Sequence, residues 1–367
     1  MTIYYFTISA LTGMGYALSL KKKENKTIVV YLTAVFLCFT LLASFRYAIG
    51  FDYFSYRNIY EIVSEWSFSD VLRFYWYEPL FYIICKLFCM SGCPYQIFLL
   101  GINIFLFLSA MNFIYRYSKL PWISVYLYIT LQFLAYNMNL IRQSVAVACF
   151  LFAYPYLKDR KIVPYTIIII IGGLFHNSLF LMLPFYFLFL KKNTIKYTVT
   201  LIAIAALGYF LFDFTFKLLL PLFPEKYANY LGGYFWSSNR FEYVIPPALY
   251  FLLIYLFSSR ISDTTKRSIY QNSALYNFLI NLFITKHFIL ERFSIYPFAF
   301  SLIAIPDIIY SYKKEKETRG KFLINYNRIL ILFLFFGAAY FAFAAVKGYH
   351  HVYPYISLLN KSRSKPN

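Results

Sequence analysis

Two charged residues, Arg46 and Asp52, lie six positions apart directly after a long apolar segment. Gly50 between them permits a tight backbone path, and Tyr53 and Tyr56 follow. Charges at the end of a membrane span cost free energy unless they meet partners or water, so they are candidates for function. The alternative is that Arg46 reaches lipid headgroups and Asp52 caps the next helix, while the tyrosines form an interfacial belt. This stretch alone does not decide between the two.

Two further candidates lie where apolar segments end. Arg142 is expected at an outer helix end, where positive charge runs against the usual inside bias. His176 follows Gly172 and Gly173 between two short apolar segments, and a helix break at membrane depth is tolerated only within protein or beside water. A histidine there can donate a hydrogen bond, act as a base or bind a phosphate oxygen. The alternatives are an arginine that reaches headgroups and a hydrogen-bonded interfacial histidine.

Other charged and aromatic residues also collect in segments expected on the outer side. They include Glu78, Arg240, Arg292 and, in an aromatic tail, Tyr355. Arginine holds carboxylates and phosphates in a bidentate fork. Aromatic rings and carboxylate side chains are suited to binding carbohydrate. The alternatives are ion pairs with neighbours and an aromatic belt. Composition indicates an anionic amphiphilic substrate handled at the outer face.

Known motifs for other chemistries are absent from the sequence. It has no GxxxxGK[ST] phosphate loop, no GxGxxG after a strand, no HExxH and no GxSxG. An ATP-driven pump and a membrane metalloprotease are therefore disfavoured. The sequence also has no DxD-like carboxylate pair, which would hold a metal-bound nucleotide sugar. We therefore expect neither a metal site nor a cofactor.

The composition sets the class of element that must position these residues. Hydrophobic residues make up 61% of the chain and charged residues 14%, which is typical of a polytopic α-helical membrane protein. A β-barrel would show short alternating segments instead of solid apolar blocks. The formal charge of +20 resides in short runs between these blocks, so cytoplasmic-loop bias explains it better than nucleic acid does. Attraction to anionic lipid or substrate stays open.

Twelve apolar segments indicate about 12 transmembrane helices. They are 2–20, 27–45, 95–115, 120–136, 139–157, 162–175, 177–190, 195–212, 243–257, 269–287, 293–311 and 327–346. The first residues lack a basic region, so we expect no cleaved signal peptide. The run Lys21–Lys23 after the first block predicts a cytoplasmic loop and an outer N-terminus.

The stretch 79–91 is too short to be counted with them, since thirteen helical residues span about 20 Å against a ~30 Å hydrocarbon core. Leaving it out places the later basic runs in the cytoplasm with Lys21–Lys23. We therefore predict an all-α polytopic integral membrane protein with a short re-entrant or interfacial helix, in a single domain 1–367. Outer loops are expected at 46–78 and 213–242, and the first has arginines and carboxylates but no lysine.

The candidate residues, taken in order, resemble the successive motifs of the EpsG/Wzy-type polysaccharide polymerases. The matching stretches are Arg46-x-x-Ile49-Gly50-x-Asp52-Tyr53-x-x-Tyr56, Ile141-Arg142-Gln143 and Phe175-His176-x-Ser178. Weaker likenesses to the late motifs are Arg292 before Tyr296, and Pro354-Tyr355. Pro297 stands where the family motif has another aromatic residue.

The resemblance implies a GT-C-like, multi-pass glycosyltransferase of the bacterial inner (cytoplasmic) membrane, with its active site facing the periplasm. Such enzymes join undecaprenyl-diphosphate-linked oligosaccharide repeat units into the O antigen of lipopolysaccharide, capsule or exopolysaccharide. The growing chain passes from its lipid diphosphate to the next unit, so the reaction needs no metal or nucleotide. The implied partners are lipid-linked oligosaccharides, membrane lipid and a chain-length regulator protein, with no nucleic acid.

Roles for the candidate residues follow from that reaction as hypotheses. Arg142, together with Arg46 or Arg292, would hold the diphosphate and stabilise the charge that develops on it. The acceptor hydroxyl needs a base, for which Asp52, Glu78 and His176 are the catalytic candidates. Asp52 is the first choice because of its place in the motif, unless it orients Arg46 instead. The remaining substrate-binding candidates are Tyr53, Tyr56, Arg240 and Tyr355.

Three other functions compete with polymerisation. An O-antigen ligase uses similar chemistry but transfers finished polymer to another lipid. A flippase or transporter of lipid-linked oligosaccharide should carry functional charges near the bilayer midplane and often shows repeat symmetry, whereas the charges here lie at one edge. A non-catalytic assembly partner should tolerate substitution of Arg142 or Asp52.

Overall fold

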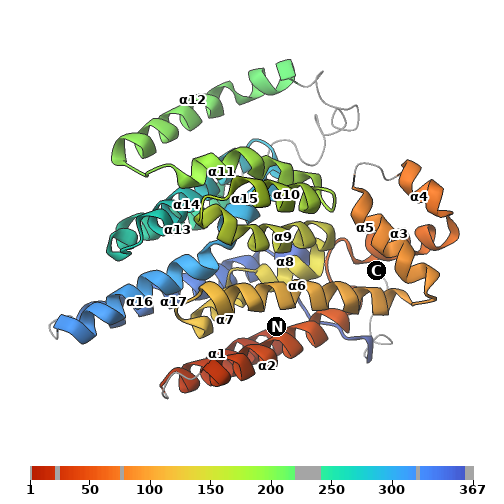
Figure 1. Cartoon of the computed structure of the whole chain (residues 1–367), viewed down its shortest axis with the longest axis horizontal. Coiled ribbons are helices and arrows are strands. Elements are labelled where there is room, and N and C mark those ends of the chain that lie inside the picture. Colours follow the sequence, from red (N-terminus) through yellow and green to blue (C-terminus); the bar gives the residue numbers. More distant parts are fainter. Residues whose placement is uncertain (1, 21–24, 75–77, 220–240, 320–322, 360–367) are drawn as a thin grey trace.

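The chain forms a bundle of helices that run mostly along one direction (Figure 1). In this computed structural model the described residues are 2–20, 25–74, 78–219, 241–319 and 323–359. The first half contains α1 (Thr2–Leu20), α2 (Asn25–Ser44), α3 (Tyr53–Glu65), α4 (Phe68–Phe74), α5 (Pro79–Met90), α6 (Tyr95–Tyr117), α7 (Pro121–Thr130), α8 (Phe133–Asn139), α9 (Ile141–Lys158) and α10 (Ile162–Gly173). The second half contains η1 (Asn177–Leu181), α11 (Met182–Leu190), α12 (Ile195–Leu219), η4 (Phe241–Tyr243), α13 (Ile245–Phe257), η5 (Ser258–Arg260), α14 (Thr264–Ile284), η6 (Phe288–Leu290), α15 (Glu291–Ala299), α16 (Ser301–Arg319), α17 (Leu323–Val346) and η7 (Tyr349–His351). No β-strand occurs within the described ranges.

Length and apolar composition mark six of the described helical stretches as long enough to cross a membrane. They are Asn25–Ser44, Tyr95–Tyr117, Ile195–Leu218, Phe241–Arg260, Phe288–Lys314 and Tyr326–Val346. Three shorter apolar helical stretches accompany them, at Pro79–Met90, Ile162–Gly173 and Asn177–Leu190. The chain is therefore a polytopic helical membrane protein, and the count of about twelve crossings stays a prediction.

The segment between α2 and α6 leaves one end of the bundle and returns to it. The Gln96 side chain, in the first turn of α6, donates to the carbonyl of Ser44 at the end of α2, and the Asn103 amide donates to the Ser44 hydroxyl at 3.1 Å. Because these ends adjoin, α3, α4 and α5 form an excursion at that end (Figure 1). The excursion therefore starts and ends at the same end of the bundle, as a re-entrant or interfacial helix at 79–91 requires, and that assignment stays a prediction. The predicted outer loop 46–78 contains α3 and α4.

Three of the expected crossings are interrupted, among them 293–311, which divides into α15 and α16 at Phe300. The apolar segment 120–136 divides into α7 and α8 at Leu131 and Gln132, because Gln132 takes a left-handed backbone with φ 70°. The segment 177–190 begins as the 3₁₀ helix η1 before continuing as α11. Hydrophobicity predicts that a segment is buried, but it does not report such breaks in the backbone. The break at η1 lies next to His176.

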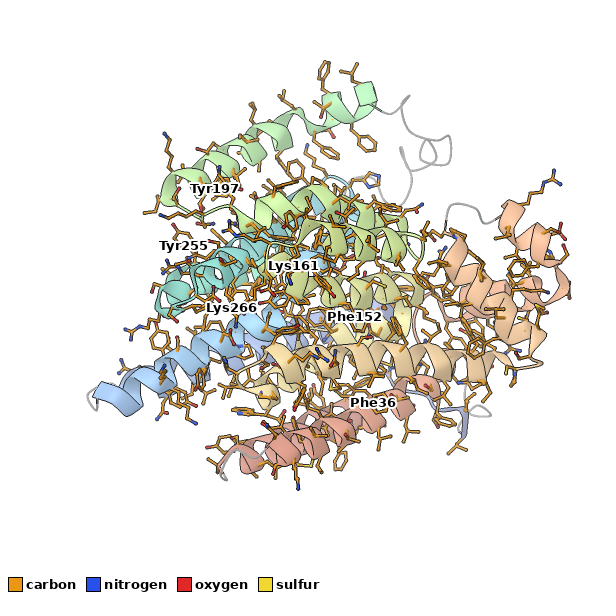
Figure 2. The ribbon with its side chains drawn as sticks, in the orientation of Figure 1. Phe36, Phe152, Lys161, Tyr197, Tyr255 and Lys266 are labelled. Atoms are coloured by element: carbon orange, nitrogen blue, oxygen red, sulfur yellow. The ribbon has the colours of Figure 1, made fainter. Side chains whose placement is uncertain are left out.

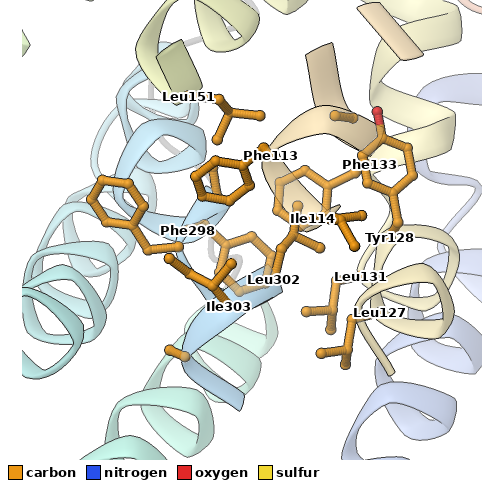
Figure 3. Packing of buried hydrophobic residues seen from close by; sticks show 14 of the residues in the cluster. Phe113, Ile114, Leu127, Tyr128, Leu131, Phe133, Leu151, Phe298, Leu302 and Ile303 are labelled. Carbon is orange, nitrogen blue, oxygen red and sulfur yellow. The ribbon is translucent and has the colours of Figure 1, made fainter. Parts of the chain in front are cut away.

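The core of the bundle is formed by aromatic and branched aliphatic side chains from many helices (Figure 2). In Figure 3, Phe113 and Ile114 of α6 lie near Leu127 and Tyr128 of α7, together with Phe298 and its neighbours from α15 and α16. A second cluster joins α3 and α5 to α6 and α9. It fixes the excursion to the bundle and thereby holds Glu78 over the start of α9.

Candidate active site

Three predicted residues from separate parts of the chain meet at the end of the bundle that carries α3–α5. Glu78 precedes α5, Arg142 lies in the first turn of α9, and His176 lies between α10 and η1. Arg142 Nη1 donates to Glu78 Oε2 at 2.6 Å, and His176 Nδ1 lies 2.8 Å from Glu78 Oε1. The backbone N–H of Asn177 donates to the same Oε1 at 3.2 Å. A single buried carboxylate therefore positions both an arginine and a histidine.

Local backbone features explain why these residues meet. Pro79 occupies the first turn of α5, where its missing N–H costs nothing. The N–H of Leu80 donates to the Leu174 carbonyl at 3.2 Å, which ties the start of α5 to the end of α10. A Cβ on Gly172 would lie 2.7 Å from the Cβ of Cys149, so only glycine lets α10 approach α9 closely enough to bring His176 to Glu78.

The hydrogen bonds define the protonation pattern of this group. Burial alone raises the pKa of Glu78, but the hydrogen bond from His176 and the charge of Arg142 outweigh burial, and the pKa lies below its ordinary value. Glu78 is therefore a carboxylate, which only accepts, so His176 Nδ1 carries the proton. In the neutral ring Nε2 then keeps its lone pair, and this buried atom has no hydrogen-bond partner among the described residues.

Aromatic rings surround the guanidinium of Arg142 on its inner side. Its Cζ lies 5.9 Å from the Tyr56 ring centroid, 6.0 Å from Phe81 and 5.8 Å from Tyr82, and Nη1 also donates to the Tyr82 hydroxyl at 2.9 Å. The side chain is 24% exposed. Nε has no hydrogen-bond partner in the described part of the chain. Arg142 is thus held in place by these contacts, while part of its side chain stays exposed.

Asp52 stands beside this centre, positioned by a tight turn. Gly50 has φ 92°, and a Cβ there would lie 2.9 Å from the Met138 carbonyl oxygen, so a side chain at this position would clash. The backbone N–H of Asp52 donates to Asn139 Oδ1 at 3.1 Å. Burial raises the pKa of the Asp52 carboxyl, and the charges of Arg292 and Arg142 offset this only in part. Asp52 occupies the N-cap position of α3, but its carboxyl makes no capping hydrogen bond there.

Arg292 completes the group from the start of α15. Its charge acts on both Asp52 and His176, yet its guanidinium makes no hydrogen bond or ion pair within the described residues. The Gln143 side chain donates to the Arg292 carbonyl and, at 3.3 Å, to the Ser178 hydroxyl. The Ser178 hydroxyl lies 2.7 Å from that of Tyr296. This network joins α9, η1 and α15 behind the charged residues.

The structure places Arg46 apart from this group. Its side chain is 0% exposed, and its guanidinium donates to the Ala43 carbonyl and lies 5.8 Å from the Tyr53 ring. The C-terminal tail covers it, because Tyr47 N–H donates to the Ile356 carbonyl at 3.0 Å and the Tyr355 hydroxyl donates to the Leu42 carbonyl at 2.9 Å. Substrate binding by these residues stays a prediction, and as folded here Arg46 has no contact with solvent.

Neighbouring tyrosines of α3 therefore serve different arginines. Tyr53 lies against Arg46, whereas Tyr56 lies against Arg142 and its hydroxyl accepts from the Arg142 N–H at 3.4 Å. Sequence reasoning did not assign a role to Tyr82, although it lies four positions after Glu78, and residues so spaced share one face of a helix. Arg240 lies outside the described residues.

Neither a metal nor an enclosed sugar pocket is indicated at this centre. Among the described residues, no group of three or more histidine, cysteine, aspartate or glutamate side chains could hold a metal ion. A cavity of about 50 Å³ adjoins the start of α15, lined among others by Tyr136, Asn277 and Glu291. That is far below the ~300–1,000 Å³ of small-molecule sites.

The chain matches the model of one protein family over nearly its whole length. Residues 29–357 match the model of the EpsG family. The chain belongs to the EpsG family. EpsG is a Wzy-type polymerase family, so this membership points to a role in polysaccharide polymerisation and agrees with the likeness seen in the motifs. No curated protein and no solved structure matches the chain.

Proposed function

We propose that this EpsG-family protein polymerises undecaprenyl-diphosphate-linked oligosaccharide repeat units at the periplasmic face of the bacterial inner membrane. The observation that carries the proposal is the ion pair that holds Arg142 on the buried Glu78, with the Asp52 carboxyl in the electrostatic field of Arg142 and Arg292. Two guanidinium groups suit a diphosphate, and the carboxylate of Asp52 suits the acceptor hydroxyl. Whether the product is O antigen, capsule or exopolysaccharide depends on the sugars supplied.

The arginines hold the leaving group in this proposal. As the bond between the anomeric carbon and the diphosphate oxygen breaks, negative charge accumulates on the lipid diphosphate. Arg142 is fixed by Glu78 before substrate arrives, so its orientation costs no further reorganisation, and preorganised charge of this kind is usually the largest catalytic term. Arg292 has no internal counterion within the described residues, so the diphosphate supplies one. No metal or nucleotide takes part in the proposed reaction.

Asp52 serves as the base. It takes the proton from the acceptor sugar hydroxyl as that oxygen forms the new bond to the anomeric carbon, and polyprenyl diphosphate departs with the electron pair of the broken bond. The raised pKa of Asp52 suits this role, because a base works best when its pKa approaches the working pH. Glu78 accepts from three donors, so it positions Arg142 and His176 instead. The second candidate for the base is His176 Nε2, which Glu78 orients through the opposite ring nitrogen.

The test is a size profile of the polysaccharide made by cells that lack this chain and are rescued with different variants. Wild type and Arg142→Ala are compared at matched protein level. Arg57→Ala is the control, since Arg57 is an exposed arginine of the same excursion whose partner is Glu61. We expect a single repeat unit on lipid in the null and Arg142→Ala cells and a normal ladder with Arg57→Ala.

Other outcomes identify the competing functions. Full-length polymer left on its lipid carrier means that the protein is a ligase. Repeat units trapped on the cytoplasmic side mean that it is a flippase. A normal ladder with Arg142→Ala removes the site proposed above, and a normal ladder in cells without the chain removes the polymerase function itself.

A further inference from the structure

A second group of charged residues lies at the opposite end of the bundle from Arg142. The helix α14 links the two ends, because it begins beside this group and ends shortly before Arg292. Its 21 residues correspond to about 30 Å of helix, close to the thickness of a hydrocarbon core. Lys266, labelled in Figure 2, lies in the first turn of α14 and donates to Asp307 of α16 at 3.2 Å. Positive-inside bias assigns this end to the cytoplasm.

These residues line a cavity of about 630 Å³, which is within the usual size range of small-molecule sites. Its charged lining is Lys119, Arg260, Asp263, Lys266, Asp307 and Lys314. Four positive and two negative side chains leave a net charge of +2. The lining comes from the α6–α7 connection, the α13–α14 connection, the start of α14 and α16, so four parts of the bundle form it together.

The two carboxylates that line the cavity already accept hydrogen bonds from Lys266. Asp263 caps α14 by accepting from the Lys266 N–H at 3.0 Å, and Asp307 Oδ2 accepts from Lys266 Nζ at 3.2 Å. Arg260 is held with its guanidinium 4.4 Å from the Tyr312 ring centroid. The start of α14 adds the positive end of a helix dipole. The cavity therefore favours an anion, which suits phosphate oxygens.

One atom of the lining points to a second property of the ligand. Asp307 is only 7% exposed, and its Oδ2 also accepts from the Tyr270 hydroxyl at 3.0 Å. Its Oδ1 is buried and has no hydrogen-bond partner among the described residues. A buried carboxylate oxygen without a donor is costly, so a ligand that supplies a hydroxyl next to its phosphate fits the cavity better than a bare phosphate.

We propose that this cavity binds a phosphate group whose substituent carries a hydroxyl donor. Lys119, Arg260 and Lys314 attract the phosphate, and Asp307 Oδ1 accepts from the hydroxyl. The same chemistry is found in a glycerophospholipid headgroup and in a soluble glycerol phosphate. This proposal concerns the end of the bundle away from Arg142, and it does not depend on the polymerase function.

The experiment measures lipid binding by the purified full chain in nanodiscs. Phosphatidylglycerol retained by the protein is counted by native mass spectrometry against a phosphatidylcholine background. The test variant is Lys119→Gln/Lys314→Gln, since both lysines are exposed. The control is Lys191→Gln/Lys192→Gln, which removes the same charge from exposed lysines after α11, outside the cavity. We expect the test variant to bind about tenfold more weakly and the control to match wild type.

Two further measurements test whether the ligand is a lipid or a soluble molecule, and whether its hydroxyl contributes to binding. Competition by added glycerol 1-phosphate indicates a soluble ligand and its failure indicates a lipid, and each result supports the shared phosphate chemistry. Phosphatidylmethanol has the charge of phosphatidylglycerol but no headgroup hydroxyl, so we expect it to bind at least threefold more weakly. Equal binding of phosphatidylglycerol and phosphatidylcholine, equal loss in both double variants, or equal binding of the two anionic lipids overturns the proposal.

Discussion

Arg142 and Arg46 lie against neighbouring tyrosines of α3, yet their surroundings are opposite. Arg142 is paired with the buried carboxylate of Glu78 and is 24% exposed. Arg46 is 0% exposed, has no ion pair within the described residues, and is covered by the C-terminal tail. An arginine built to receive an anion needs a fixed orientation and an open side, and only Arg142 has both.

The comparison also separates two uses of a positive charge. A buried cation without a counterion costs free energy, so Arg46 is retained at a cost, and it acts within the junction between the end of α2 and the tail. Burial costs Arg142 less free energy, because the carboxylate of Glu78 balances its charge. The following predictions test whether this division between a chemical and a structural arginine is correct.

The largest effect is expected from Arg142→Met. Removing the guanidinium takes away charge stabilisation of the departing diphosphate, so the polymerisation rate with purified lipid-linked repeat units should fall about 10³-fold. The change also leaves Glu78 buried without its partner, which destabilises the fold, so a thermal unfolding profile in nanodiscs must accompany the rate. Arg142→Lys keeps the charge without the planar fork and should recover only part of the rate. Full activity in Arg142→Met would contradict the assignment.

Asp52→Asn should lower the same rate about 10²-fold, because the acceptor hydroxyl loses its base. The base must be ionised, so activity of wild type should decline as pH falls through the Asp52 pKa. Burial raises that pKa, so the decline should be centred above ~3.9, the ordinary value of aspartate. The measurement is a pH–rate profile of wild type and Asp52→Asn. If the variant keeps the acidic decline, and it lies below the ordinary histidine value of ~6.5 as burial of His176 requires of its pKa, His176 is the base.

Part of this site could be predicted from the sequence because its residues break strong rules. Arg142 and His176 stood out because charge and polar groups interrupt apolar segments, and Asp52 stood out beside Gly50. These inferences use local patterns, and the structure brings Asp52, Glu78, Arg142 and His176 together. The positions of the helices were also predictable, since each apolar block forms a helix or a pair of helices.

The division between the two arginines could not be predicted in the same way. Whether Arg46 faces substrate depends on the tail near Tyr355, which lies more than 300 residues later in the chain. The pairing of Glu78 with Arg142 likewise depends on how α5 packs against α10, and hydrophobic pattern does not encode that register. The backbone break at Gln132 depends on a left-handed residue that apolar length does not reveal.

Arg46→Met should have a smaller effect than Arg142→Met, although the chemical change is the same. Methionine fills much of the volume and removes an uncompensated buried cation, and replacing buried charge by apolar groups is often neutral or stabilising. We expect the folded yield and the polymerisation rate to stay within about threefold of wild type. The control is Tyr355→Phe, which loses the hydrogen bond from the tail to the Leu42 carbonyl of α2 and should cost about 1 kcal/mol of stability. A loss in rate as large as that of Arg142→Met, with an unchanged unfolding temperature, would show that Arg46 contacts substrate.

The smallest effects are expected from the tyrosines that lie against the two arginines, Tyr56 beside Arg142 and Tyr53 beside Arg46. The Tyr56 hydroxyl accepts a hydrogen bond from the backbone of Arg142, at 3.4 Å, so Tyr56→Phe loosens the start of α9. One such bond contributes about 0.5–1.5 kcal/mol, which corresponds to a two- to tenfold fall in rate. Tyr53→Phe keeps the ring beside Arg46 and should change the rate less than twofold. Both rates are measured at saturating repeat unit. If Tyr53→Phe has the larger effect, the open face of the site lies toward Arg46, and the division between the two arginines must be reversed.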